Sequence, residues 1–175
     1  MESGAVFWIT GLAGSGKSTI AKFLKKRLEK SVAVLLLDGD DLRQVFSHAF
    51  TYSMESRFKA AQCYSRLCKL VSEQGIDVIC PTISLFHEIH AWNKQNLRNY
   101  IEIYLNVPID ILVKEGKREF YQQQEIKDKH QDVAGIDFLP QPPSHPDIII
   151  NNREVTAEQA VEQILNFYFQ RVKTL

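Results

Sequence analysis

One eight-residue stretch near the N-terminus constrains the fold of this chain more than any other feature. Residues 11–18 read Gly-Leu-Ala-Gly-Ser-Gly-Lys-Ser and match the pattern G-x-x-x-x-G-K-[ST] at every position. The preceding residues, 5–10, form a short apolar run rich in β-formers, and apolar residues recur at helical spacing over 20–28. Strand, loop and helix in this order are the context that a phosphate-binding loop needs. The motif therefore predicts an α/β fold that binds a nucleoside triphosphate.

The residue types in the loop match the chemistry of nucleotide binding. Glycines reach backbone angles closed to other residues, so successive amide N–H groups can turn inward around phosphate oxygens. The helix that follows adds the partial positive charge of its N-terminus. Lys17 is placed to reach the β- and γ-phosphates, and the Ser18 hydroxyl is placed to ligate Mg²⁺. We expect MgATP to contact Gly11, Ala13, Gly14, Ser15, Gly16, Lys17, Ser18 and Thr19.

Composition narrows the class of protein. The 175 residues are 45% hydrophobic, enough for a single domain spanning 1–175 with a buried core. Twenty-one basic and 21 acidic residues give zero formal charge, so we expect neither a nucleic acid nor a membrane as partner. The N-terminus has no signal pattern, and no apolar run approaches a membrane span, which predicts a cytoplasmic protein. The three cysteines form no C-x-x-C pair and the five histidines are scattered, so we expect neither a disulfide framework nor a zinc site.

Strand and helix patterns alternate along the chain. Strands are predicted at 5–10, 32–37, 76–82, 100–107 and 147–151, with helices near 17–28, 53–74, 86–98, from 109 and after 156. This alternation predicts a doubly wound α/β fold with a five-stranded parallel sheet flanked by helices. The run at 32–37 is apolar on both faces, which favours the middle of the sheet. Residues of about 114–145 are polar and proline-terminated, and we interpret them as a lid, the alternative being a solvated hairpin.

Three carboxylates follow the second predicted strand. Asp38, Asp40 and Asp41 would lie at the carboxyl end of an inner strand, the edge where ligands bind in open α/β sheets. One of them could orient Mg²⁺ or take a proton from an attacking hydroxyl. The spacing does not decide which one. The alternative role, capping a helix, is expected for Asp41.

With these motifs in place, the chain resembles the adenylylsulfate kinase family, which phosphorylates the ribose 3′-hydroxyl of adenylyl sulfate with MgATP. The resemblance covers almost the whole chain and implies a P-loop kinase fold. It rests on residues 8–12, 37–43, 52–57, 83–84, 135–137 and 146–147. The D-G-D-x-(I/L)-R element that follows the P-loop strand and helix is its most specific part.

The resemblance implies a catalytic group of three residues. Asp40 would be the general base or the organiser of the metal, with Asp38 supporting it and Lys17 holding the transferred phosphate. Ser18 and Asp40 would be the protein ligands of Mg²⁺.

The resemblance also implies an acceptor site for a small-molecule nucleotide. Arg43 and Arg57 match arginines that hold the acceptor's anionic group, the structural alternative being an exposed salt bridge. Tyr52 stands where the family has an aromatic residue that stacks on the acceptor base. Ser84 matches a serine at the edge of the active site. A homodimer is left open.

Departures from the family pattern fall mostly on the acceptor side. Ser56 replaces an Asp of the family, and Ala60 replaces an Asn. Val133 replaces a second base-stacking Phe, and Gln131 replaces a Lys two residues before that Phe. Leu85 and His87 replace a Pro and an Arg. The Arg-Asp pair of the family's lid is replaced by residues 115–116, and whether Lys117 or Arg118 substitutes stays open.

Three functions remain after these comparisons of residues. The first, and the default by resemblance, is adenylyl sulfate phosphorylation, for sulfate assimilation. The second is the same reaction on another nucleotide, such as cytidine diphosphoramidate in capsule or other polysaccharide modification. The third is a nucleotide-binding protein without turnover, which the intact Lys17, Ser18 and Asp40 weigh against.

Overall fold

The structure is a computed structural model that describes residues 2–47, 49–114 and 138–172. Its strands form one sheet, and all the paired strands run parallel. The sheet has five strands in the order β2-β3-β1-β4-β5: β1 Ala5–Gly11, β2 Val34–Leu36, β3 Asp77–Thr82, β4 Asn99–Leu105 and β5 Ile148–Ile150. The predicted five-stranded parallel sheet is confirmed.

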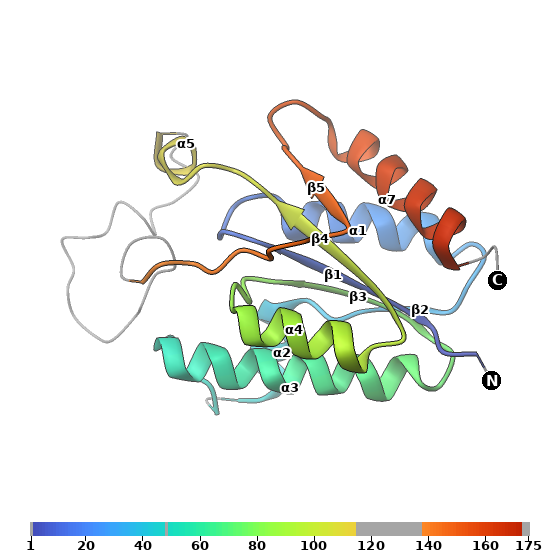
Figure 1. The fold of residues 1–175 in the computed structure, drawn as a ribbon, viewed down its shortest axis with the longest axis horizontal. Coiled ribbons are helices and arrows are strands. Elements are labelled where there is room, and N and C mark those ends of the chain that lie inside the picture. The colour runs from blue at the N-terminus through green and yellow to red at the C-terminus, as the bar shows by residue number, and fades with distance from the viewer. Residues whose placement is uncertain (1, 48, 115–137, 173–175) are drawn as a thin grey trace.

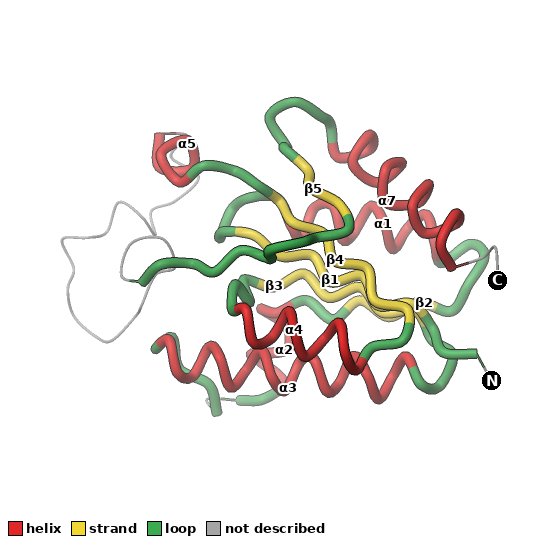
Figure 2. The backbone as a smooth tube through the Cα atoms, viewed as in Figure 1, coloured by secondary structure: helices red, strands yellow, loops and turns green. Residues whose placement is uncertain are grey.

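Helices cover both faces of this sheet (Figures 1 and 2). Helices α1 and α7 lie on one face, and α2, α3 and α4 lie on the other. The helices are α1 Lys17–Leu28, α2 Gly39–Val45, α3 Met54–Ser72, α4 His87–Asn96, α5 Ile109–Lys114 and α7 Ala157–Val172. Most of the predicted lid, residues 115–137, lies outside the described residues.

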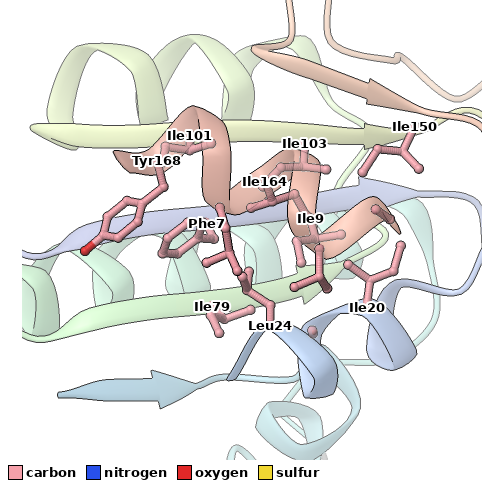
Figure 3. Packing of buried hydrophobic residues seen from close by; sticks show 14 of the residues in the cluster. Phe7, Ile9, Ile20, Leu24, Ile79, Ile101, Ile103, Ile150, Ile164 and Tyr168 are labelled. Carbon is pink, nitrogen blue, oxygen red and sulfur yellow. The ribbon is translucent and has the colours of Figure 1, made fainter. Parts of the chain in front are cut away.

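The hydrophobic core is split by the sheet into two layers because β1, its central strand, is buried along all seven residues. Phe7 and Ile9 face α1 and α7, where they pack with Leu24 and Ile164 (Figure 3). Trp8 points the other way, into a layer formed with α3 and α4. Alternation of side chains along a strand therefore supplies both layers from one apolar run.

The position of β2 corrects the sequence prediction. The run at 32–37 was expected in the middle of the sheet, but β2 is an edge strand that pairs with β3, and Leu35 is 40% exposed. Val34 and Leu36 pack against the core on the α1 side. An apolar run can thus serve an edge strand when a neighbouring helix covers one face. The carboxylates that follow it lie at the end of an edge strand, not of an inner strand.

Helix boundaries follow local hydrogen bonds that the sequence indicates. Thr156 begins α7 with a capping box: its hydroxyl accepts from the Gln159 amide at 3.2 Å, and the Gln159 side chain accepts from the Thr156 amide at 2.8 Å. The Ser53 hydroxyl caps α3 by accepting a hydrogen bond from the backbone amide of Ser56. Helix α3 ends before Gly75, whose φ of 81° allows the turn into β3.

Candidate active site

The loop between β1 and α1 has the conformation that its glycines predict. Gly14 and Gly16 have φ angles of 73° and 89°, a region that residues with a Cβ rarely adopt. Helix α1 begins at Lys17, so its free N-terminal amides face the loop. The Lys17 ammonium donates to the carbonyl oxygens of Gly11 at 3.0 Å and Leu12 at 2.7 Å. The loop is therefore a concave set of amides with a cation at its mouth.

A cavity of about 690 Å³ opens beside this loop at the carboxyl edge of the sheet. One side of it is formed by the loop and the start of α1, through Ala13, Gly14, Gly16, Lys17, Ser18 and Thr19. Predicted acceptor and catalytic residues also line it: Asp38, Asp40, Arg43, Tyr52, Arg57 and Ser84. The structure thus brings together residues that are up to about 70 positions apart in the chain. Gly11 and Ser15 belong to the loop but do not line this cavity, and Val133 lies outside the described residues.

The two carboxylates of the cavity have different surroundings. Asp38 is buried and caps α2, accepting from the backbone amide of Asp40 at 3.1 Å. Asp40 is exposed to the cavity. The expectation that Asp41 caps the helix is wrong, because α2 begins at Gly39 and its cap is therefore Asp38. Asp41 is exposed and lies in the first turn of α2, where its charge complements the helix dipole.

Arg43 and Arg57 converge on the ring of Tyr52. Their guanidinium carbons lie 4.6 and 5.3 Å from its centre, within the range of a cation–π contact. Arg43 also donates to the carbonyl oxygens of Phe50 at 3.0 Å and Thr51 at 2.8 Å, and Arg57 donates to that of Tyr52 at 2.8 Å. Arg43 is thus held by backbone and ring contacts rather than by the exposed salt bridge considered as its alternative. The cluster presents two cations and an aromatic ring to the cavity.

Tyr64 is a cavity residue that sequence reasoning missed. It follows Ala60 by one helical turn on α3, and both line the cavity. Its hydroxyl donates to the carbonyl oxygen of Gly39 at 3.4 Å. Burial raises the pKa of Tyr64 to about 12, although the nearby Arg43 lowers it. The phenol is therefore a neutral donor at physiological pH. The signal that could have found it is its spacing from Ala60, since residues four apart share one helix face.

Two stacked aromatic residues also line the cavity. Phe86 and Phe138 have nearly parallel rings, 6° apart, with centroids separated by 6.3 Å, and both line the cavity. The Ser84 hydroxyl forms a buried hydrogen bond of 2.8 Å with Thr82. The His87 side chain, which replaces a family arginine, lies 3.1 Å from the carbonyl oxygen of Pro142. Sequence reasoning missed Phe138 because its position in the chain gives no sign that it returns to α4.

The donor set of the cavity fits magnesium better than a transition metal. Among the described residues no group of three or more His, Cys, Asp or Glu side chains could hold a metal ion. The Ser18 hydroxyl and the Asp40 carboxylate line the same cavity. Mg²⁺ takes oxygen ligands, keeps several waters and is commonly completed by substrate phosphates. One hydroxyl and one carboxylate beside a phosphate loop are what such an ion needs from the protein.

Comparison with known proteins decides the family. The family model described as adenylylsulphate kinase matches residues 3–151. The chain belongs to the adenylylsulphate kinase family. The resemblance inferred from its motifs is thereby confirmed, as is the expectation that it is a phosphotransferase of this kind.

Two relatives with similar levels of identity carry different names. A cytidine diphosphoramidate kinase of Campylobacter jejuni is 35% identical over 162 residues, which are 91% of this chain and 94% of the relative. An adenylyl-sulfate kinase of Clostridium acetobutylicum is 33% identical over 174 residues, which are 97% of this chain and 85% of the relative.

The solved structures confirm the P-loop kinase fold. An APS kinase of Mycobacterium tuberculosis, CysC, in complex with AMPPNP and APS, superposes with a TM-score of 0.86 over 95% of this chain and 98% of its own, at 24% identity. Among the described residues, no helix combines the length and apolar character that crossing a membrane requires. The homodimer that the sequence left open stays open.

Proposed function

We propose that this protein is a kinase that transfers the γ-phosphoryl group of MgATP to the ribose 3′-hydroxyl of a nucleotide. The observation that carries the proposal is the shared cavity, which is lined by the phosphate loop, by Asp40 and by the Arg43–Tyr52–Arg57 cluster. Phosphoryl transfer is mostly positioning and charge stabilisation, so it needs a donor site and an acceptor site that face one another. Residues suited to both roles line one cavity.

The donor half would work through the loop amides and Lys17. Amides of the loop and of the start of α1 would hold the β- and γ-phosphate oxygens, and the Lys17 ammonium would leave its loop carbonyls to neutralise them. Ser18 and Asp40 would hold Mg²⁺, which neutralises charge between the β- and γ-phosphates when bound. All the atoms that develop negative charge would then face fixed donors.

The acceptor half would work through Asp40 and the basic cluster. The ribose hydroxyl oxygen attacks the γ-phosphorus, the bond from that phosphorus to the ADP oxygen breaks, and the hydroxyl proton passes to the Asp40 carboxylate. Asp38 holds the backbone of Asp40 in place through its 3.1 Å hydrogen bond. Arg43 and Arg57 would bind the acceptor's anionic group, and Tyr52 would offer a ring to its base.

Cytidine diphosphoramidate is the acceptor that we favour. The departures from the family pattern fall mostly on the acceptor side, among them the cavity residue Ala60 in place of the family's Asn, which favours an acceptor other than adenylyl sulfate. The 35% identity to a cytidine diphosphoramidate kinase along nearly the full length of both chains supports the same choice. Adenylyl sulfate is the second candidate because the family match and many of the relatives point to it.

A side-by-side assay tests the proposal. ADP release is coupled to an indicator reaction, and kcat/KM is measured for cytidine diphosphoramidate and for adenylyl sulfate at matched concentrations. We expect a clear preference for the cytidine compound, with the new phosphate assigned to the 3′-position from its phosphorus–hydrogen coupling by NMR. Preference for adenylyl sulfate would replace the favoured acceptor with the second candidate.

Two controls keep the assay interpretable. The Lys17→Ala variant should abolish turnover with either acceptor, and turnover at the wild-type rate would disprove the loop assignment. MgADP binding is measured separately by calorimetry. Tight binding of MgADP without phosphorylation of any nucleotide would leave the non-catalytic nucleotide-binding protein as the answer.

A further inference from the structure

Asn152 connects the phosphate loop to the turn after β5. Its side-chain amide nitrogen donates a hydrogen bond to the carbonyl oxygen of Ser15, a residue 137 positions earlier in the chain. The amide oxygen of Asn152 is buried and has no hydrogen-bond partner in the part of the chain that the structure describes. Rotating the amide by half a turn would place that oxygen against the Ser15 oxygen. The contact with Ser15 therefore sets the orientation of the amide.

The turn that carries Asn152 is itself organised by hydrogen bonds. The Asn151 side chain accepts from the amide of Arg153 at 3.1 Å and donates to the carboxylate of Glu154 at 2.8 Å. The Glu154 amide donates to the Asn151 carbonyl oxygen at 2.9 Å. Asn152 thus reaches the loop from a braced turn between the sheet and α7.

The loop and Asn152 are packed without spare room. A Cβ placed on Gly16 would lie 2.6 Å from the amide nitrogen of Asn152, closer than real Cβ atoms come to such a neighbour. Gly16 also has a φ of 89°. Glycine rotates more freely than any other residue, so its peptide group needs an outside contact to hold one orientation. Asn152 supplies that contact.

The geometry of a peptide bond shows what this contact does. The peptide between Ser15 and Gly16 is trans, so its C=O and N–H groups point in opposite directions. The Ser15 oxygen points to Asn152, and the Gly16 N–H therefore points away from it. Gly16 lines the cavity described above. Holding the Ser15 oxygen from behind thus fixes an amide donor of the nucleotide site.

We propose that Asn152 is a positioning residue for the nucleotide, which it never needs to touch: it fixes the Ser15–Gly16 peptide in the orientation that presents the Gly16 N–H to phosphate. The proposal rests on the proposed function only in taking the loop's ligand to be a nucleoside phosphate. A loop held in its binding conformation loses less conformational freedom on binding. Asn152 should therefore control the affinity for the phosphate donor, MgATP or MgADP, and not the affinity for the acceptor.

The test compares Asn152 with an asparagine that makes the same bond elsewhere. Asn99, at the amino end of β4 and so at the end of the sheet away from the loop, donates its side-chain amide to the carbonyl oxygen of Ser3 at 2.7 Å, also joining distant segments. Asn152→Leu and Asn152→Asp remove the donor at nearly constant shape, and Asn99→Leu and Asn99→Asp are the matched controls. The dissociation constant for MgADP is measured by calorimetry, and the unfolding midpoint is measured without nucleotide.

We expect Asn152→Leu to weaken MgADP binding about 3- to 10-fold, the range for one net hydrogen bond. Asn152→Asp should weaken it further, because the carboxylate repels both the Ser15 oxygen and the phosphates. Both Asn99 variants should bind within about twofold of wild type, since their contact lies away from the loop, even where their unfolding midpoints fall. The KM for the acceptor should not change in folded Asn152 variants.

The outcomes separate the two proposals. Wild-type affinity for MgADP in both Asn152 variants, or a lowered unfolding midpoint with unchanged affinity, would overturn the positioning role alone. If Asn152→Leu does not fold, Asn152→Asp carries the same test. A wild-type protein that binds no MgADP would instead overturn the proposed function.

Discussion

The Asp38 carboxylate accepts a hydrogen bond from the backbone amide of Asp40 at 3.1 Å. This contact gives the two acids different roles, because Asp38 caps a helix and the Asp40 carboxylate is left for the cavity. Asp38 is buried and occupied at the start of α2, whereas the Asp40 carboxylate faces the cavity. Spacing in the sequence could not distinguish them. The distinction gives separate expectations for the two residues.

Asp40→Asn should reduce the rate of phosphoryl transfer while leaving the fold intact. The substitution removes the charge that accepts the hydroxyl proton or orients the metal, at nearly constant shape. A general base contributes about 100- to 10,000-fold in rate. Single-turnover measurements at saturating substrates check this, and a loss of less than about tenfold would assign Asp40 a merely structural role.

Asp38→Ala should lower stability through loss of the helix cap. Removing a capping carboxylate costs about 1 kcal/mol of unfolding free energy. Asp38→Asn keeps an acceptor oxygen and should recover most of this loss. Urea unfolding of the three proteins measures the difference. Equal stability of Asp38→Ala and wild type would contradict the capping role.

Tyr52→Ala should raise the KM for the acceptor and leave the KM for ATP unchanged. Stacking on an aromatic ring is worth about 0.5–1.5 kcal/mol, or about 2- to 12-fold in affinity. The same ring also holds Arg43 and Arg57, at 4.6 and 5.3 Å, so its loss releases both cations. Tyr52→Phe keeps the ring and should behave as wild type in steady-state kinetics. A large effect of Tyr52→Phe would point to the hydroxyl instead.

A buried carboxylate under α4 gives a prediction about pH. Glu102 on β4 is fully buried, with one carboxylate oxygen 2.8 Å from both the His90 ring nitrogen and the donating Tyr100 hydroxyl. Lys94 lies 3.3 Å from the other oxygen. Burial raises the pKa of Glu102, but these three partners outweigh it and hold the pKa below its ordinary value. The carboxylate is therefore ionised inside the protein.

Glu102→Gln should destabilise the protein at neutral pH by about 1.5–3 kcal/mol, the range for a hydrogen bond to a charged group. Because folding lowers the pKa, the stabilisation by Glu102 is complete above the unfolded value of about 4.3 and is lost as pH falls through the folded value. The stability gap between wild type and variant should thus narrow with acidification. Urea unfolding between pH 7 and the lowest pH at which both proteins fold measures it, and a constant gap would exclude the ionised form as the source.

The parts of the site that sequence could predict are those fixed by local geometry. Gly14 and Gly16 predicted a loop with positive φ angles, and the motif fixes Lys17 and Ser18 directly after it. The parts that sequence missed depend on contacts between distant segments. Phe138 reaches Phe86, and Asn152 reaches Ser15, from positions that share no pattern with their partners.

The sequence predictions of the position of β2 in the sheet and of the cap of α2 were wrong for a related reason. The run at 32–37 is apolar enough for a central strand, and only the arrangement of the other strands makes β2 an edge. Asp41 was expected as the cap because the sequence does not fix the exact residue at which α2 begins. A shift of three positions in the helix start transfers that role to Asp38. Such a shift is within the ordinary uncertainty of helix ends predicted from sequence.

Both edges of the sheet are short, since β2 and β5 have three residues each whereas β1 and β4 have seven. An edge strand offers unpaired backbone groups to any other extended chain, and brief edges limit the number on offer. The long, strongly apolar strands are enclosed between them. During expression or heating, the folded protein should therefore resist strand-by-strand aggregation, and precipitation should require loss of the whole sheet.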